Sequence, residues 1–459
     1  MNLKHVLYVI LLLGGFSLVL GMSKSGDLPS DEFARRRAIF LNELRDLNAC
    51  AILHSAPEYE RNHDVNFQYR QNSDFIYLTN WSYPRGILVL SPQPEQSDQA
   101  EVTFFVTPRN PKTEVWTGPR AGLEAVAAFS NVDTVFAYSD FFDHLGKVVK
   151  GYDRLVISYG DDAEFQSEFD KRLRHIWRHP AIVQEASVLL QAHRLIKSEA
   201  EIKALERAIS ITGASLVDAF KIIPTLNFEY EAQAEIEYGF KRRGAVRPGF
   251  PSIIGAGRNS TFLHYEDHGG ELKPGDILLM DVGAEWDFYS ADISRTVPVS
   301  GTFSTEQALI YQLILDAQSA AIKSVKPGAA FRKPHNVAVE VVTAGLVKLG
   351  LLEGDPNILI KERGYRKFFM HGTSHWLGLD VHDAGGYVDM AGEPYVLKTG
   401  MVLTVEPGIY ISESDDIDQK WWNIGIRIED DVLVTEKGFH ILSESIPKTI
   451  QEIEHLMQP

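Results

Sequence analysis

The sequence predicts two domains: an α/β domain over residues 30–192, and an α+β domain over residues 193–459 that consists of two matching halves. The length of 459 residues favours more than one domain, and an apolar content of 44% is enough for two cores. Short apolar runs alternate with helical patterns in the first part. In the second part, two helices followed by a hairpin with two acids occur twice, which predicts a pseudo-twofold arrangement without a residue-level repeat.

Residues 1–21 have the layout of a signal peptide. Lys4 and His5 precede an uncharged run from Val6 to Leu20, and Val19-Leu20-Gly21 would serve as the cleavage site. We therefore expect an exported protein, either periplasmic or secreted. An uncleaved membrane anchor is the alternative, because the uncharged run continues to Ser23, and a cytosolic tail is a third reading.

The pattern of residues 30–192 predicts a domain with its own sheet. Ser30 is expected to cap a helix that continues through Ile39 and Leu44. Further helical patterns cover Leu123–Phe129 and Phe165–Trp177. Short apolar runs predict strands at Ala51–Leu53, Phe75–Thr79, Gly86–Leu90, Val102–Val106, Thr134–Tyr138 and Leu155–Tyr159. Composition singles out no catalytic residue in this domain.

The helix pair of the first half begins after residue 193. Ser198 and Glu201 form a capping box in front of apolar positions with helical spacing. A second helix is expected over Glu229–Arg243, and Gly244 ends it.

The second half repeats this order. Ser304 and Gln307 form another capping box, and that helix stops near Pro327. The next helix is expected over Pro334–Leu349, ended by Gly350.

Each helix pair precedes a hairpin with two acids. Over Leu278–Val299 the chain folds back around Trp286 to Phe288, which would set Asp281 directly opposite Asp292. The second hairpin, Met401–Thr435, turns at the polar loop Ser412–Lys420. Pairing the residues on either side of this loop sets Glu406 opposite Glu429.

Four buried carboxylates this close together require cations between them. Without cations, burial and mutual repulsion raise carboxyl pKa values and oppose folding. Four carboxylates balance two divalent cations, and one imidazole would complete a hard, oxygen-rich ligand set that suits Mn, Co, Fe or Mg. The expected site holds two metal ions and supports hydrolysis.

The stretch Met370–Asp383 supplies candidate imidazoles, with three histidines and two acids in fourteen residues. His371 and His375 have the spacing of a helical zinc pair, but Gly372 and Gly378 oppose a helix, and Leu377, Leu379 and Val381 alternate as in a strand. A regular strand would point His375 and His382 to opposite faces, so we expect a turn or bulge near Gly378 if both serve the site.

These residues resemble the signature of the Xaa-Pro aminopeptidase (aminopeptidase P) family of metallopeptidases. The resemblance runs from about residue 30 to the C-terminus and includes Y-R-Q-N-S-D-F-I-Y-L-T at Tyr69–Thr79. The matching motifs are His264 in F-L-H-Y-E, Asp281 in M-D-V-G, Asp292 in A-D-I-S-R-T, His375 in H-G-T-S-H-W-L-G-L-D-V-H-D, Glu406 in T-V-E-P-G and Glu429 in G-I-R-I-E-D-D. The resemblance implies a pita-bread catalytic domain.

The resemblance also implies roles for the site residues. The metal ligands would be Asp281, Asp292, His375, Glu406 and Glu429, holding two divalent ions, which we expect to be Mn(II). Glu406 would also act as the general base, and His382 would hydrogen-bond the scissile carbonyl oxygen. His264 and His371 would line the pocket for the proline, Arg427 would orient Glu429, and Asp383 would support the loop.

Substrates and partners follow from the same resemblance. The expected substrates are peptides with proline in the second position, and the expected assembly is a homo-oligomer, a dimer or a tetramer. Trp116 is a further candidate, because a tryptophan in the matching segment of the family helps to close the pocket. We expect no nucleic-acid partner, since 45 basic and 62 acidic residues give a net charge of −17.

Two alternative functions remain. A prolidase, which cleaves Xaa-Pro dipeptides, shares the five ligands, and a non-catalytic pita-bread module would bind peptides without cleaving them. The chain also departs from the family between Gly386 and Met401, where Lys398 is the one basic residue in place of the family's arginine. We expect that departure to affect the preference for peptide length.

Overall fold

The computed structural model describes residues 28–92, 101–129, 132–388 and 392–458, and it divides into two compact units, Met1–Ala192 and His193–Pro459. The signal peptide or anchor expected at residues 1–21 lies outside the described residues and stays a prediction. One described helical stretch, Glu199–Thr225, is long and apolar enough to cross a membrane, but over half of its most apolar window is buried, as in a core helix.

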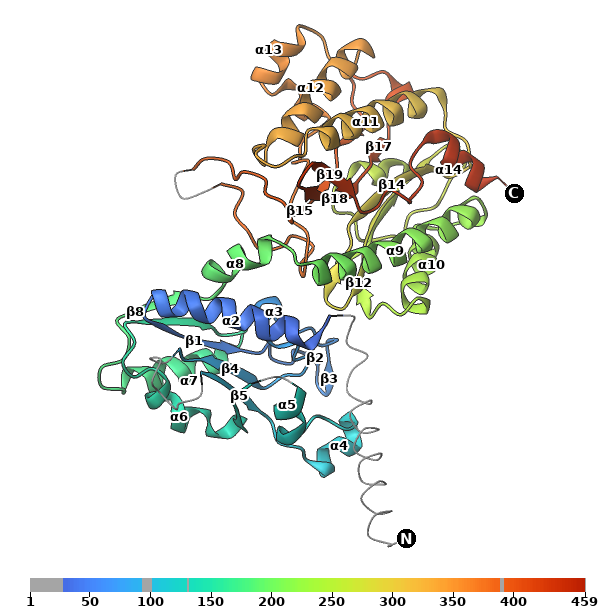
Figure 1. Cartoon of the computed structure of the whole chain (residues 1–459). Coiled ribbons are helices and arrows are strands. Elements are labelled where there is room, and N and C mark those ends of the chain that lie inside the picture. The colour runs from blue at the N-terminus through green and yellow to red at the C-terminus, as the bar shows by residue number, and fades with distance from the viewer. Residues whose placement is uncertain (1–27, 93–100, 130–131, 389–391, 459) are drawn as a thin grey trace, which may run out of the picture. The chain divides into compact units, whose positions relative to one another are not determined.

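The first unit is a mixed six-stranded sheet in the order β6-β5-β4-β1-β7-β8 with helices on both faces (Figure 1). Its strands are β1 (Ala49–His54), β4 (Gly86–Leu90), β5 (Val102–Val106), β6 (Thr134–Ala137), β7 (Arg154–Ser158) and β8 (Ile182–Glu185), beside the small pair β2 (Glu60–Asn62) and β3 (Val65–Asn66). Its helices are α2 (Ser30–Asp46), α3 (Ser73–Thr79), α4 (Pro111–Thr117), α5 (Leu123–Phe129), α6 (Phe141–Val148), α7 (Ala163–Arg174) and α8 (Ser187–Leu195), the last of which continues into the second unit. Cys50 is buried in the core that β1 forms with α6 and α7.

One strand predicted for this unit is wrong. Phe75–Thr79 lies in the helix α3, because the Asn72 side chain accepts hydrogen bonds from the backbone N–H groups of Asp74 and Phe75 and so caps a helix. The apolar pattern alone does not distinguish a buried short helix from a buried strand.

The second unit consists of two helix pairs and the strands that follow each pair. The first half contains α9 (Glu199–Ile222), α10 (Glu229–Arg242), β9 (Arg247–Pro248), β10 (Ile253–Ala256), β11 (Ile277–Val282), β12 (Ala284–Trp286), β13 (Tyr289–Ser290) and β14 (Ile293–Pro298). The second half contains α11 (Thr305–Lys323), α12 (Lys333–Lys348), α13 (Pro356–Lys361), β15 (Val402–Val405), β16 (Gly408–Ile411), β17 (Ile424–Arg427), β18 (Asp430–Thr435), β19 (Gly438–Ile441) and α14 (Ile450–Met457). Both predicted capping boxes are present, at Ser198 with Glu201 and at Ser304 with Gln307.

The two halves meet through their strands. In Figure 1, α9 and α10 lie on one side of the strands, and α11 and α12 lie on the other. The segment after β17 runs alongside β14, where the backbone N–H of Glu429 donates to Ser294 O at 3.1 Å and the Thr296 hydroxyl donates to Arg427 O at 3.1 Å. The acid-bearing segments of both halves are thereby held next to each other.

Candidate metal and substrate site

One cavity in the second unit, about 570 Å³ in volume, brings the predicted site residues together. It is lined by all the residues predicted as metal ligands, as catalytic groups or as histidines of the proline pocket: His264, Asp281, Asp292, His371, His375, His382, Glu406, Arg427 and Glu429. Its remaining wall is largely apolar and includes Phe250, Pro251, Ile253, Leu263 and Val381. The cavity therefore combines a charged floor with walls that suit a small apolar group.

The first hairpin differs in register from the prediction. Asp281 lies opposite Ser294, not opposite Asp292. The turn consists of Asp287 and Phe288, both with positive φ, so the chain folds one residue later than expected. Because the pairing changes by two residues, Asp281 and Asp292 stay on the same face as diagonal neighbours.

The second hairpin has the predicted register. Val405 pairs with Asp430 on one side and Gly408 pairs with Arg427 on the other, and this continuous register sets Glu406 opposite Glu429. Both acids lie in the short gap between the two strand pairs.

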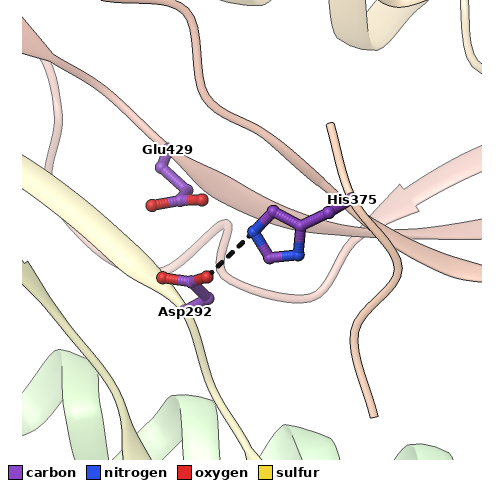
Figure 2. Close-up of side chains that lie close together, drawn as sticks. All are labelled: Asp292, His375 and Glu429. Carbon is purple, nitrogen blue, oxygen red and sulfur yellow. Dashed lines mark ion pairs between the residues drawn. The ribbon is translucent and has the colours of Figure 1, made fainter. Parts of the chain in front are cut away.

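The buried acids and His375 face one another as ligands of a cation would (Figure 2). Ligand atoms of Asp292, His375 and Glu429 all lie within 4.8 Å of one another. His375 donates from Nδ1 to Trp376 O at 3.1 Å, which directs the lone pair of Nε2 toward Asp292 Oδ2 at 3.2 Å. Among the described residues, the buried Asp281 Oδ1 and Asp292 Oδ1 atoms have no hydrogen-bond partner. A lone pair that faces a carboxylate, and two orphaned carboxylate oxygens, fit a site for divalent cations.

The carboxyl pKa values point to the same conclusion. Burial, followed by the charges of Asp281 and Asp431, raises the pKa of Asp292 well above its ordinary value. Burial and the charge of Asp292 do the same to the pKa of Glu429, and burial raises the pKa of Glu406 to about 7. Cations among these groups would relieve the repulsion.

Arg427 connects the two hairpins. Its guanidinium donates to Asp281 Oδ2 at 2.6 Å, to the Ser294 hydroxyl at 2.9 Å and to the Tyr410 hydroxyl at 2.7 Å. Ser294 in turn donates to Glu429 Oε2 at 2.7 Å. Arg427 was predicted to orient Glu429; the described contacts show that it binds Asp281 directly and reaches Glu429 through Ser294.

His371 is held in one neutral tautomer. Its Nδ1 lies 2.6 Å from Gly372 O, an acceptor, so Nδ1 carries the proton. Its Nε2 therefore accepts from the Tyr410 hydroxyl at 2.9 Å, since Arg427 already donates to that oxygen. Burial, with the nearby charge of Arg427, lowers the pKa of His371 to about 3. Both ring nitrogens are engaged by the chain, which leaves the ring face for a substrate.

His382 reaches the site through a turn. The strand predicted for Leu377–Val381 is wrong. The chain instead closes a loop there, in which the Asp383 N–H donates to Trp376 O at 2.9 Å. The turn includes Gly378, as predicted, and it brings the His382 ring to 4.1 Å from the His375 ring, measured between centroids. Burial and the neighbouring His375 lower the pKa of His382, which favours its neutral form.

Two of the predicted residues are exposed. One is His264, which lines the cavity. Trp116 lies on α4 in the first unit, where its side chain is 89% exposed, and its role stays a prediction.

Sequence reasoning missed Ser294 and Tyr410, which link the acids to Arg427 and His371. A signal was present for Ser294, because it lies two residues from Asp292 and so on the same face of the hairpin. Tyr410 had none, since a single tyrosine in an apolar strand is ordinary core composition.

The fold, the carboxylate-rich cluster and the cavity define a metal-dependent hydrolase. A family model described as Metallopeptidase family M24 matches residues 203–436, and one described as Aminopeptidase P, N-terminal domain, matches residues 33–157. The chain belongs to metallopeptidase family M24, in the aminopeptidase P (Xaa-Pro aminopeptidase) group. The pita-bread fold expected for residues 193–459 is confirmed.

Relatives with this organisation are similar over nearly their whole length. The chain is 38% identical to a Haemophilus influenzae Xaa-Pro aminopeptidase over 435 residues, which are 94% of this chain and 98% of the relative. The structure of Pseudomonas aeruginosa aminopeptidase PepP is similar with a TM-score of 0.88 and 40% identity, covering 94% of this chain and 98% of that one. A variant of Escherichia coli aminopeptidase P in complex with substrate has a TM-score of 0.90 and 35% identity, with coverage of 94% and 99%.

Proposed function

We propose that this chain is a dinuclear-metal aminopeptidase that releases the N-terminal residue from peptides with proline in the second position. The observation that carries this function is the convergence of the two acid pairs and His375 at the floor of one partly apolar cavity. The similarity to Xaa-Pro aminopeptidases over whole chains supports the same substrate class.

Proline in the second position makes the scissile bond unusual. The ring fixes φ and removes the amide hydrogen, so an enzyme must recognise the ring itself and cannot rely on a backbone N–H. The apolar wall formed by residues such as Phe250 and Leu263 supports recognition of the ring.

The metal ligands would be Asp281, Asp292, His375, Glu406 and Glu429. Two divalent ions held there would lower the pKa of a water molecule and polarise the scissile carbonyl. The oxygen-rich ligand set supports manganese(II) as the metal.

Glu406 accepts the proton of the attacking water at a carboxylate oxygen. A general base is most effective when its pKa lies near the working pH, and its position beside His375 puts it at the reacting centre. His382, neutral and partly exposed, donates to the scissile carbonyl oxygen as negative charge develops there. His264 and the face of His371 hold the proline ring.

Location and assembly are further parts of the proposal. The charged start and apolar run of residues 1–21 support export, with a membrane anchor as the alternative. The exposed Trp116 supports a subunit contact at α4 and hence a homo-oligomer.

A peptide assay tests the function. The metal-depleted protein is supplied separately with Mn, Co or Zn and given Xaa-Pro-Xaa tripeptides, Xaa-Pro dipeptides and matched Xaa-Ala-Xaa tripeptides. We expect release of the first residue from the Xaa-Pro-Xaa peptides, highest with Mn, and little cleavage of the alanine controls. Cleavage of the dipeptide alone would identify a prolidase, and no cleavage with any metal would favour a binding module.

A further inference from the structure

A buried ion cluster lies behind the loop that carries His382. The loop, residues 376–383, is closed by the bond from the Asp383 N–H to Trp376 O, and the Asp380 N–H points at Asp383 Oδ1 at 3.4 Å. The backbone O of Gly378 accepts from the Ser290 N–H at 2.9 Å, which connects the loop to the first hairpin, the one with Asp281 and Asp292.

Asp383 is held by two cations from the start of the second unit. Its Oδ1 accepts from Arg194 at 2.5 Å and its Oδ2 accepts from Lys197 at 2.8 Å. The side chains of Lys197 and Asp383 are each 1% exposed, and that of Arg194 is 5% exposed. Burial alone would raise the pKa of Asp383, but the two cations hold it below its ordinary value, so the carboxylate is charged. Asp380, on the same loop, neutralises the second positive charge through Arg194 at 2.7 Å.

The cluster leaves no space for a side chain at Gly378. A Cβ atom on Gly378 would lie 2.2 Å from Asp383 Oδ2 and 3.0 Å from Lys197 Cε. The Lys197 N–H also donates to Gly400 O at 2.8 Å, so the backbone of this cation is fixed as well as its ammonium group.

We propose that Asp383, clamped between Arg194 and Lys197, is a positioning residue that holds His382 beside His375 in the orientation needed to meet the substrate carbonyl. The reason is geometric. His382 is the neighbour of Asp383 in the chain; its side chain is exposed, and its ring lies against the ring of His375. The buried carboxylate of Asp383, one residue away, holds the backbone that carries His382 in place.

This inference rests on the proposed role of His382, and the experiment separates the two. Asp383→Asn keeps the shape of the side chain but removes its charge, and Lys197→Met keeps the apolar stem but removes the cation. Each is measured alone and combined with His382→Ala, on an Xaa-Pro-Xaa peptide, with metal content determined for every protein. Asp218→Asn is the matched control: it removes the charge of a half-buried carboxylate on α9 that pairs with Arg242 and Arg243 at the end of α10.

The expected result is a loss of kcat with little change in KM. Asp383→Asn and Lys197→Met should each lower kcat at least tenfold while KM stays within threefold and the metal content is unchanged. In the His382→Ala background the same changes should lower kcat less than threefold further, because the group that they position is already gone. Asp218→Asn should behave like the wild type.

Other outcomes overturn the inference. Full additivity with His382→Ala, or kcat within twofold of the wild type, would show that the cluster does not act through His382. A His382→Ala variant with wild-type kcat would remove the role of His382 itself. If Asp383→Asn fails to fold, Gly378→Ala tests the same point without changing a charge: its methyl group must displace the Asp383 carboxylate, and wild-type kcat in that variant would contradict the proposal.

Discussion

The guanidinium of Arg427 makes three hydrogen bonds in three directions, which a lysine cannot reproduce. It holds Asp281 directly, Glu429 through Ser294, and His371 through Tyr410. Arg427, Asp281 and Glu429 are buried, so the network fixes side chains from both hairpins before a metal or substrate arrives.

Arg427→Lys should therefore lower kcat/KM by about 10- to 100-fold and weaken metal binding, although the positive charge is kept. The measurement is steady-state hydrolysis of an Xaa-Pro-Xaa peptide across a metal titration. Arg242→Lys, in an exposed ion pair with Asp218, is the control and should change neither quantity. Wild-type kinetics in Arg427→Lys would show that charge alone suffices at this position.

At the level of single residues, the sequence predicts the metal ligands better than it predicts the residues that hold site side chains in place. The four acids could be predicted because each lies in an apolar run, and the acid pairs repeat in mirrored positions. Ser294, Tyr410 and Lys197 have no such pattern. Their partners are distant in the sequence, as with Arg427 and Asp281, 146 residues apart, so only the fold brings them together.

The two hairpins show what decides strand register. The second has a continuous register on both sides of its gap, and a symmetric fold about its polar loop was enough to predict it. The first turns at Asp287 and Phe288, which both have positive φ although neither is glycine or asparagine. Asp287 favours a turn there, but no glycine or asparagine beside it marks the centre of the turn, so the sequence placed the turn one residue too early. Likewise, the helix at Phe75–Thr79 depends on its Asn72 cap and not on its apolar pattern.

The break between β11 and β12 depends on Gly283. A Cβ atom there would lie 1.8 Å from Ala291 O and 2.9 Å from Phe250 Cε1, so a side chain must push away the segment between β13 and β14, which carries Asp292. Gly283→Ala should lower the free energy of unfolding by at least about 2 kcal/mol and weaken metal binding.

Thermal unfolding of the metal-loaded protein checks this prediction. Gly269→Ala is the matched control, because a Cβ atom at Gly269 meets nothing within 4 Å. Equal stabilities for the two variants would contradict the account of the break.

At the scale of the whole molecule, the site exists because two half-domains each contribute an acid pair at their common seam. In the metal-free protein these acids repel one another, and the folded structure tolerates them by keeping protons on some of them. Because metal ions bind the deprotonated carboxylates, metal binding, protonation and folding of the second unit are linked.

The sign of this linkage follows from the raised pKa values. Burial raises the pKa values of Asp292 and Glu429 well above their ordinary range and that of Glu406 to about 7, so these carboxyl groups keep their protons to higher pH than ordinary carboxyl groups when no metal is bound. Metal uptake must displace those protons. Metal affinity should therefore weaken as the pH falls below 7 and strengthen as it rises.

The most direct test of the central claim is calorimetric titration of the metal-free protein with Mn(II) at pH 7, in buffers of different ionisation enthalpy. The account predicts two ions bound per chain with a net release of protons. A stoichiometry of one or none, or binding that releases no protons, would contradict a site made of two acid pairs and His375.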